Sequence, residues 1–182
     1  MTQNDEAQYI ERILNGETEL FSVFLDRYSH PLYVLVVQIV GCAEDAEELV
    51  QDVFLKAFRN LNSYRRDSRF STWLYRIAYN AAVSATRKKK HEYCYIDECT
   101  INNVPDEQER VLFDETESEE KISQLTQAID LLDNQEKALI TLFYYEEKSV
   151  EEIGEILNIS VSNVKVRLHR TRKKLCVLIN GK

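Results

Sequence analysis

Apolar side chains recur every three or four residues along most of this chain, which is the spacing of amphipathic helices. The pattern predicts helices over residues 5–15, 19–29, 32–40, 44–60 and 71–91. It predicts further helices over residues 119–132 and 135–145, then two short helices joined by a tight turn within residues 149–175. Only four glycines and two prolines interrupt the 182 residues. The sequence therefore predicts an all-α protein.

The pattern also predicts where helices start and which side chains they bury. Pro31 suits the first turn of the helix over residues 32–40, and Ser71 suits the N-cap of the helix over residues 71–91. The side chains expected inside this last helix are Trp73, Leu74, Ile77, Ala78 and Ala81. Those expected nearer the surface are Tyr75, Arg76, Tyr79, Asn80 and residues 87–90. The helix over residues 44–60 is expected to bury Ala46, Leu49, Val50, Val53, Phe54, Ala57 and Phe58.

The helical periodicity fades between residues 92 and 118, where acidic and polar residues surround Pro105. This composition favours a flexible acidic linker. Its negative charge leaves open a second reading, in which the segment mimics nucleic acid inside a basic channel. The chain is thus predicted to form two small helical domains, residues 1–91 and 119–182, joined by residues 92–118.

Residues 149–175 have the pattern of a helix-turn-helix. Ser149 and Glu152 have the spacing of a capping box, and Ser160 can cap the second helix. Asn158 tolerates the left-handed backbone of a tight turn, and Gly154 within a helix favours a close approach of another backbone. On the second helix Val161, Val164, Leu168 and Leu175 share the apolar face. The polar and basic face carries Ser162, Asn163, Lys165, Arg167, His169, Arg170, Arg172, Lys173 and Lys174. A basic recognition helix predicts DNA binding, although an ordinary hairpin with a solvated basic face has the same pattern.

Charge is distributed very unevenly along the chain, whose net charge is −8. Residues 63–91 carry eight Lys and Arg side chains against one acidic side chain, and residues 159–182 carry seven against none. The remaining segments are strongly acidic. Two basic islands within an acidic protein are consistent with DNA binding, because positive charge is needed only where the phosphates lie.

The first basic island also contains aromatic and amide side chains. Tyr64 lies in a loop with three arginines, and Tyr75, Tyr79 and Asn80 follow on the next predicted helix. Rings stack on unpaired bases while cations hold the backbone, so this segment predicts binding to melted DNA. The simpler alternative is that Trp73 and one of the tyrosines belong to the core.

Other classes of function find little support in the sequence. The longest apolar run, residues 32–40, is too short to cross a membrane, and the polar N-terminus lacks a signal-peptide pattern, so a cytoplasmic protein is expected. His91, Cys94 and Cys99 lack the spacing of a metal site, and all four cysteines are expected to stay reduced. No catalytic constellation is evident. We therefore expect no metal, no cofactor, no small-molecule substrate and no enzymatic activity.

Three motifs together resemble the sigma-70 family of RNA polymerase sigma factors, in particular the extracytoplasmic-function (ECF) group. They are DAEELVQDVFLKAF, FSTWLYRIAYNAA and SVEEIGEILNISVSNVKVRLHRTRKKL, in the order and spacing of the core-binding, promoter-melting and promoter-reading regions. The resemblance implies two helical domains, sigma regions 2 and 4. It also implies the partners: RNA polymerase core through its β′ clamp helices and β flap, promoter DNA, and in many relatives an anti-sigma factor.

The resemblance assigns roles to particular residues. Those implied in binding polymerase core are Asp45, Glu48, Leu49, Gln51, Asp52 and Leu55. Those implied at the promoter −10 element are Lys56, Tyr64, Arg65, Arg76 and Asn80. Those implied at the −35 element are Ser162, Asn163, Lys165, Val166, Arg167, His169, Arg170, Arg172 and Lys173.

The chain departs from the family pattern in the loop around Tyr64. Arg66 stands where the family commonly has glycine, and Ser84 stands where some members have a second asparagine. The −10 sequence therefore cannot be transferred from relatives. Two alternatives stay open: a stand-alone operator-binding regulator that uses the same helix-turn-helix, and a helical adaptor that binds only proteins.

Overall fold

The computed structural model describes residues 3–87 and 119–180, and every regular element within them is helical. In the N-terminal half these are α1 (Gln3–Leu14), η1 (Thr18–Phe21), α2 (Ser22–Val40), α3 (Ala43–Arg59), η2 (Leu61–Ser63) and α4 (Phe70–Thr86). In the C-terminal half they are α7 (Glu119–Asp130), α8 (Asn134–Ile140), the π-helix η3 (Thr141–Tyr145), α9 (Val150–Leu157) and α10 (Val161–Asn180). The all-α prediction is confirmed. The predicted linker and the residues 88–91 lie outside the described residues.

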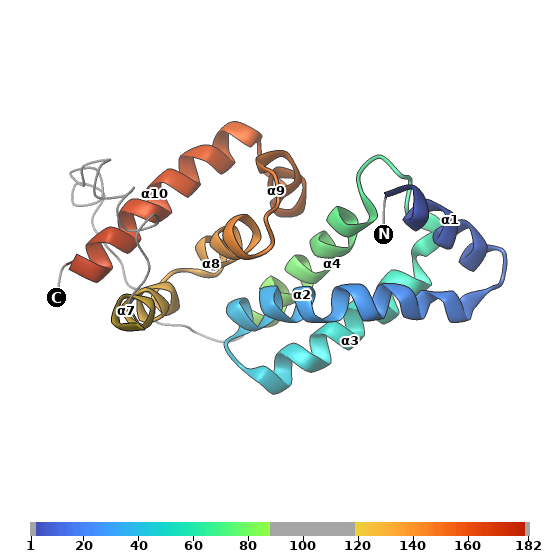
Figure 1. Ribbon diagram of the computed structural model, residues 1–182, viewed down its shortest axis with the longest axis horizontal. Coiled ribbons are helices and arrows are strands. Elements are labelled where there is room, and N and C mark those ends of the chain that lie inside the picture. Colours follow the sequence, from blue (N-terminus) through green and yellow to red (C-terminus); the bar gives the residue numbers. More distant parts are fainter. Residues whose placement is uncertain (1–2, 88–118, 181–182) are drawn as a thin grey trace.

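Helices α2, α3 and α4 pack against one another to form the N-terminal half (Figure 1). Their contact is filled by aromatic and aliphatic side chains with no measurable exposure, among them Phe24, Leu35 and Leu74. Phe24 lies 4.4 Å from Phe70 between ring centroids, which links α2 to the start of α4. This core accounts for the apolar faces that the periodicity predicts on these helices.

Helix α2 runs without a break through Pro31, so the predicted boundary at that residue is wrong. A proline inside a helix removes one backbone hydrogen bond and costs about 3 kcal/mol. Tyr28 and Leu32, on either side of Pro31, are both buried in the same core, and this burial favours the continuous helix. The helix ends as predicted at Gly41, whose left-handed backbone (φ 71°) suits glycine.

Three other local predictions are also wrong. Helix α4 begins at Phe70, with Arg69 as its N-cap, and Ser71 is buried inside the first turn. Tyr75 and Tyr79 are 1% and 7% exposed instead of lying near the surface, because the C-terminal half covers this side of α4. Phe58, expected inside, is 38% exposed at the last turn of α3 and contacts Phe21 edge-on.

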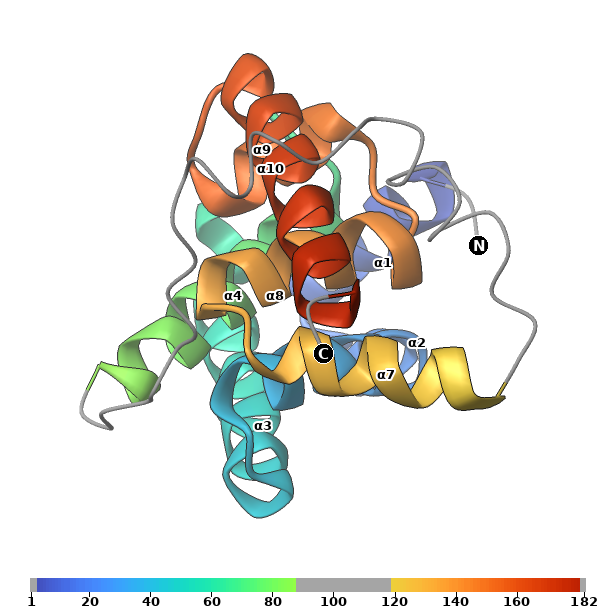
Figure 2. The same ribbon diagram turned by 90° about the vertical axis from the view of Figure 1, so that its left-hand side faces the viewer.

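The C-terminal half is organised around α10, which packs on α7, α8 and α9. Both views show α7 near the C-terminal end of α10 (Figures 1 and 2). A small core forms there from Ala128, Ile129, Leu132, Ile140 and Leu175. Helix α8 starts with a complete capping box, in which Asp133 accepts from two backbone amides and Glu136 accepts from the amide of Asp133.

The two halves pack against each other through one continuous hydrophobic core. Helix α9 lies against α4, and α8 lies against α2. Polar contacts supplement this core: the Tyr75 hydroxyl donates to Glu146, Asn134 Nδ2 donates to Thr86 Oγ1 at 2.7 Å, and Arg69 pairs with Glu152 at 3.5 Å. The residues predicted to contact DNA therefore lie, in this structure, on two halves that are packed directly against each other.

Candidate nucleic-acid interface

Helices α9 and α10 form the helix-turn-helix that the sequence predicts. The Ser149 hydroxyl accepts from the Glu152 amide at 3.2 Å, and the Glu152 carboxylate accepts from the Ser149 amide at 3.0 Å, which completes the capping box. Asn158 has the predicted left-handed backbone (φ 57°). A Cβ atom on Gly154 would lie 2.9 Å from the Ile159 carbonyl oxygen, so only glycine fits this turn. All three predictions are confirmed.

Helix α10 presents a polar face to solvent. Ser160 caps it by accepting from the Asn163 amide at 3.2 Å, and Val164, Leu168 and Leu175 point into the core. The predicted −35 residues that are exposed are Ser162, Asn163, Lys165, Val166, His169 and Arg170. Val166, an apolar side chain that is 54% exposed, lies within this face. An exposed apolar contact among polar readers suits a thymine methyl group in the major groove.

Three other basic side chains of α10 contact neighbouring residues of the protein. Arg167 donates from Nη1 to Gln135 at 2.6 Å and from Nε to Asn163 at 3.1 Å. The Arg172 guanidinium lies over the Phe143 ring at 5.5 Å from its centroid. Lys174, predicted on the basic face, is instead buried and pairs with Glu136 at 2.7 Å.

Gln135 helps to position the polar face of α10, a role that the sequence did not indicate. It lies on α8 and accepts a hydrogen bond from Arg167 on α10. Nothing in the local pattern around Gln135 distinguishes it from a solvated helix-face residue. Only the packing of α8 against α10 brings the two side chains together.

The loop before α4 is closed on itself around Tyr64. The Tyr64 hydroxyl donates to the Ser68 carbonyl oxygen at 2.6 Å, and its ring lies 5.4 Å from Trp73 and 5.7 Å from Phe70. Burial raises the pKa of the Tyr64 phenol, and Glu6 raises it further. Arg66, at the middle of the loop, has a left-handed backbone with φ 62°.

The other predicted −10 residues, on α3, on α4 and in the loop before α4, lie on the surface. Lys56, Arg65, Arg76 and Asn80 are all exposed. Trp73, Arg76 and Asn80 are three and four residues apart, so they follow one side of α4 away from the Tyr64 ring. The structure thus places Asn80, predicted to contact a base, about two helical turns, roughly 10 Å, beyond Trp73 and the Tyr64 ring that contacts it.

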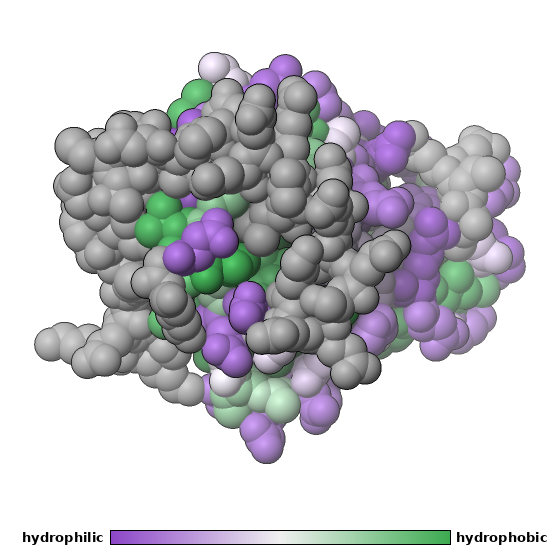
Figure 3. Space-filling model, turned by 60° about the vertical axis from the view of Figure 1, so that its left-hand side comes forward, coloured by the Kyte–Doolittle hydropathy of each residue, from purple (hydrophilic) through white to green (hydrophobic). Residues whose placement is uncertain are grey.

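Figure 3 shows hydrophilic residues over much of the described surface in that view, with small apolar patches between them.

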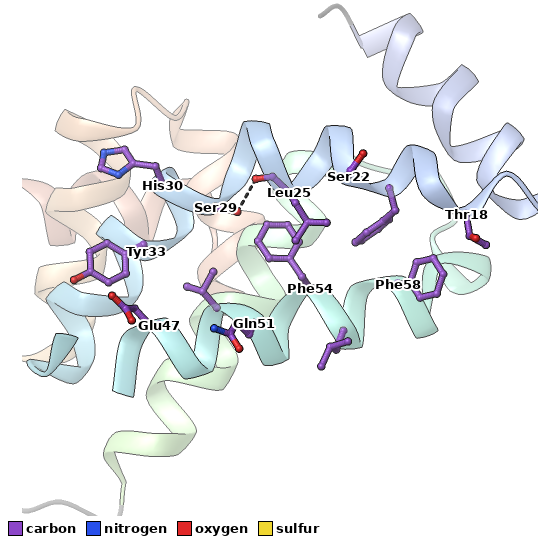
Figure 4. Close-up of a pocket in the computed structure, with 13 residues that line it drawn as sticks. Thr18, Ser22, Leu25, Ser29, His30, Tyr33, Glu47, Gln51, Phe54 and Phe58 are labelled. Atoms are coloured by element: carbon purple, nitrogen blue, oxygen red, sulfur yellow. Dashed lines mark hydrogen bonds between the residues drawn. The ribbon is translucent and has the colours of Figure 1, made fainter. Parts of the chain in front are cut away.

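Four of the six residues predicted to bind polymerase core line two grooves beside α3, whereas Asp45 and Glu48 line neither. Gln51 and Leu55 line the larger groove, of about 750 Å³, between α2 and α3. Figure 4 shows side chains of both helices facing this groove. Leu49 and Asp52 line a second groove of about 470 Å³ that continues to Lys56 and to Ala81 on α4. The α2 side of the larger groove, including Leu25, His30 and Tyr33, was not predicted as part of the surface.

Comparisons with known proteins agree with this arrangement. Residues 24–92 match the model of Sigma-70 region 2, and residues 122–175 match that of Sigma-70, region 4. The chain is 34% identical over 172 residues to the ECF RNA polymerase sigma factor SigW of Bacillus subtilis, covering 91% of this chain and 92% of that protein. It is 31% identical to the ECF RNA polymerase sigma-E factor of Escherichia coli, covering 91% and 90%. The chain belongs to the ECF group of the sigma-70 family. Sigma factors direct RNA polymerase to promoters and are not themselves enzymes.

Solved structures of other sigma factors share the fold. CnrH, solved in complex with the cytosolic domain of CnrY, matches with a TM-score of 0.67 at 21% identity and covers 96% of both chains. The sigma factor RpoE of Bartonella quintana, solved with the anti-sigma factor NepR, matches with a TM-score of 0.64 at 19% identity. That match covers 88% of this chain and 96% of the other.

Metal-ligating groups, cysteines and membrane-spanning helices bear on other possible functions of this sigma factor. Within residues 3–87 and 119–180 no cluster of three or more His, Cys, Asp or Glu side chains could hold a metal ion. His91, Cys94 and Cys99 lie outside the described residues, while Cys42 and Cys176 form no disulfide within them. Over the same described ranges, no helix has the length and apolar character needed to cross a membrane.

Proposed function

We propose that this ECF sigma factor binds polymerase core through α3, the −10 element through the Tyr64 loop and α4, and the −35 element through α10. One observation carries the proposal: exposed basic side chains gather on α10 and around α4, two surfaces that belong to different halves of the chain. A stand-alone operator-binding regulator would need only the first of these surfaces. The proposed domain organisation is region 2 in residues 1–91, a linker in residues 92–118 and region 4 in residues 119–182.

The groove between α2 and α3 supports α3 as the core-binding element. Leu55 is 52% exposed and Phe58 is 38% exposed, so the groove offers apolar area that an approaching helix would bury. Acidic side chains, among them Glu47 at the groove and Glu48 on the outer face of α3, surround this area. This combination suits a helical partner with apolar and basic side chains, such as the β′ clamp helices. The C-terminal half would contact the β flap.

The −35 assignment divides α10 by the chemistry of its side chains. Asn163 and Val166 offer contacts to base edges, whereas Lys165 and Arg170 offer charge to phosphates. Arg167 is held by Gln135 and Asn163, so its role would be to orient Asn163 as well as to supply charge.

An anti-sigma factor is a further proposed partner. Both structural neighbours named above were solved in complex with a regulatory chain, CnrY or NepR. The exposed apolar groove beside α3 is a surface on which such a chain could compete with polymerase. We further propose that the protein works in the cytoplasm, where polymerase and promoter DNA are found.

Run-off transcription of genomic fragments by purified core polymerase, with and without the protein, tests the function. New start sites that share two spaced upstream elements are expected only when the protein is present. Leu55→Asp should abolish both core binding and initiation. Leu14→Asp is the matched control, because Leu14 is an equally exposed leucine (51%) on α1 and outside the groove. Tight binding of the free chain to a palindromic operator, without any initiation, would contradict the proposal.

A further inference from the structure

Arg66 adopts a backbone conformation that its side chain disfavours. Within the described ranges it is one of three non-glycine residues with positive φ, beside Glu147 and Asn158. Asn tolerates this left-handed region because its short side chain can hydrogen-bond locally, but arginine has no such compensation. Glycine would adopt the same backbone freely. An arginine that is kept in this conformation points to a function for its side chain.

The surroundings of Arg66 leave its charge available. The residue is exposed, and no hydrogen bond or ion pair joins its guanidinium to another residue in the part of the chain that the structure describes. The other arginine at the end of the loop, Arg69, is engaged with Glu152 at 3.5 Å. Arg66 also lies close enough to the Tyr64 phenol for its charge to oppose the rise in the pKa of that group that burial causes.

The base of the loop fixes the backbone on both sides of Arg66. The hydrogen bond from Tyr64 to Ser68 closes the five residues whose central member is Arg66. The Tyr64 ring is fixed in turn against Phe70 and Trp73. Phe70 and Trp73 are buried, so of these three rings only the half-buried Tyr64 offers a face to an unpaired base, and Arg66 lies exposed at the tip of the loop. An exposed ring face beside a cation suits single-stranded nucleic acid, because bases stack on rings while phosphates contact cations.

We propose that Arg66 binds a backbone phosphate of the unpaired DNA strand at the −10 element, beside the base that the Tyr64 loop holds. The inference rests on the function proposed above and adds a residue to its DNA contacts. The guanidinium stays charged at every physiological pH and matches a phosphate with two parallel hydrogen bonds. A phosphate contact adds affinity for melted DNA without selecting a base.

The test measures binding of holoenzyme, reconstituted from core polymerase and this chain, to fork-junction DNA with a randomised unpaired strand at −10. Four proteins are compared: the unaltered chain, Arg66→Gly, Arg66→Asn and Arg66→Lys. Gly and Asn both accept the left-handed backbone, so these variants remove the charge and keep the loop. Thermal unfolding of each chain verifies the fold. For Gly and Asn the slope of log affinity against log salt should fall in magnitude by about 0.7, the value for one phosphate on a single strand. Lys should keep the slope, and base preferences should stay the same in all four.

Two results would overturn the role of Arg66 while leaving the sigma function intact. An unchanged salt slope in Arg66→Gly would show that the side chain does not contact a phosphate. A lost preference at one base position in that variant would show that Arg66 reads a base edge instead. Failure of the unaltered holoenzyme to bind any fork-junction DNA would overturn the proposed −10 function, and the role of Arg66 with it.

Discussion

At the scale of single residues, Gly154 is the position in the helix-turn-helix that sterics constrain most. An alanine at this position would raise helix propensity, but its Cβ would meet the Ile159 carbonyl oxygen at 2.9 Å. The contact is with backbone, which cannot move away as the end of a flexible side chain can. We expect Gly154→Ala to lower the free energy of unfolding by about 1–3 kcal/mol.

Urea unfolding followed by circular dichroism measures this effect. Glu155→Ala is the matched control, because Glu155 is exposed on the same helix and should be close to neutral. Equal stability of Gly154→Ala and the unaltered chain would mean that the turn relaxes without cost.

Two buried tyrosines set a limit on stability at high pH. Burial, and then the neighbouring Glu146, raises the pKa of Tyr75 far above its usual value, and burial and Glu6 do the same for Tyr28. Each phenol therefore remains protonated in the folded protein but ionises near pH 10 in the unfolded chain. The stabilisation is fully present below pH 10 and is lost as the pH rises above it.

The melting temperature between pH 8 and pH 11 reports this loss. It should fall steeply above pH 10 in the unaltered chain and less steeply in Tyr75→Phe, which cannot ionise. The hydroxyl that Tyr75→Phe lacks donates to Glu146, so this variant should also melt lower at pH 8. Parallel curves for the two proteins would exclude Tyr75 as a cause.

At the scale of elements, we expect α10 to make both phosphate and base contacts along one exposed face. Lys165 is exposed, and no hydrogen bond or ion pair joins it to another of the described residues. Asn163 is oriented by the Arg167 side chain, which Gln135 holds from α8. Removing the Lys165 side chain and removing the Asn163 side chain should therefore change DNA binding in different ways.

We expect Lys165→Ala to weaken holoenzyme binding to all −35 sequences alike and to reduce the salt slope by about 0.9, one phosphate on duplex DNA. Asn163→Ala should instead relax the preference at one or two −35 positions, and Gln135→Ala should do so more weakly. Binding to a randomised −35 library at several salt concentrations separates these outcomes. A base-specific effect of Lys165→Ala would contradict the assignment.

At the scale of the whole molecule, the closed packing of the two halves is incompatible with reading both promoter elements. The −10 and −35 elements are about 25 base pairs apart, which is roughly 85 Å along B-form DNA. A compact chain of this length has a radius of gyration of only about 16 Å. Helix α9, half of the DNA-reading motif, lies directly against α4, so the halves must separate on a promoter.

Energy transfer between dyes at Asp26→Cys on α2 and Glu155→Cys on α9 measures the separation, with the native cysteines replaced. Both sites are exposed and outside the proposed contact surfaces. Transfer should be high in the free chain and drop when core polymerase and promoter DNA are added. A pair within the N-terminal half, Leu14→Cys and Asp26→Cys, should not change. High transfer in the promoter complex would rule out the opening.

Most of the helices, the capping box at Ser149 and the helix-turn-helix could be predicted from the sequence, since each depends on contacts between residues that are close in the chain, whereas the predicted cap at Ser71 and the boundary at Pro31 were wrong. Apolar spacing encodes a helix and its buried face, and Ser149, Gly154 and Asn158 encode a turn that closes within a few residues. The two basic islands are also visible in the sequence, and the exposed side chains of α10 confirm one of them as a surface.

Which polar and aromatic side chains are buried depends on contacts between residues far apart in the chain. The local pattern places Tyr75 at the surface, but its hydroxyl donates to Glu146, 71 residues later in the chain. The same pattern places Lys174 on the DNA-binding face, but its ammonium group pairs with Glu136. The local pattern around Pro31 predicts a helix start, but the core shared by the residues on both sides of it favours one continuous helix. The physical reason is common to all three. Burying a polar group, or tolerating a missing hydrogen bond, is favourable only when a distant partner compensates, and local periodicity carries no information about that partner.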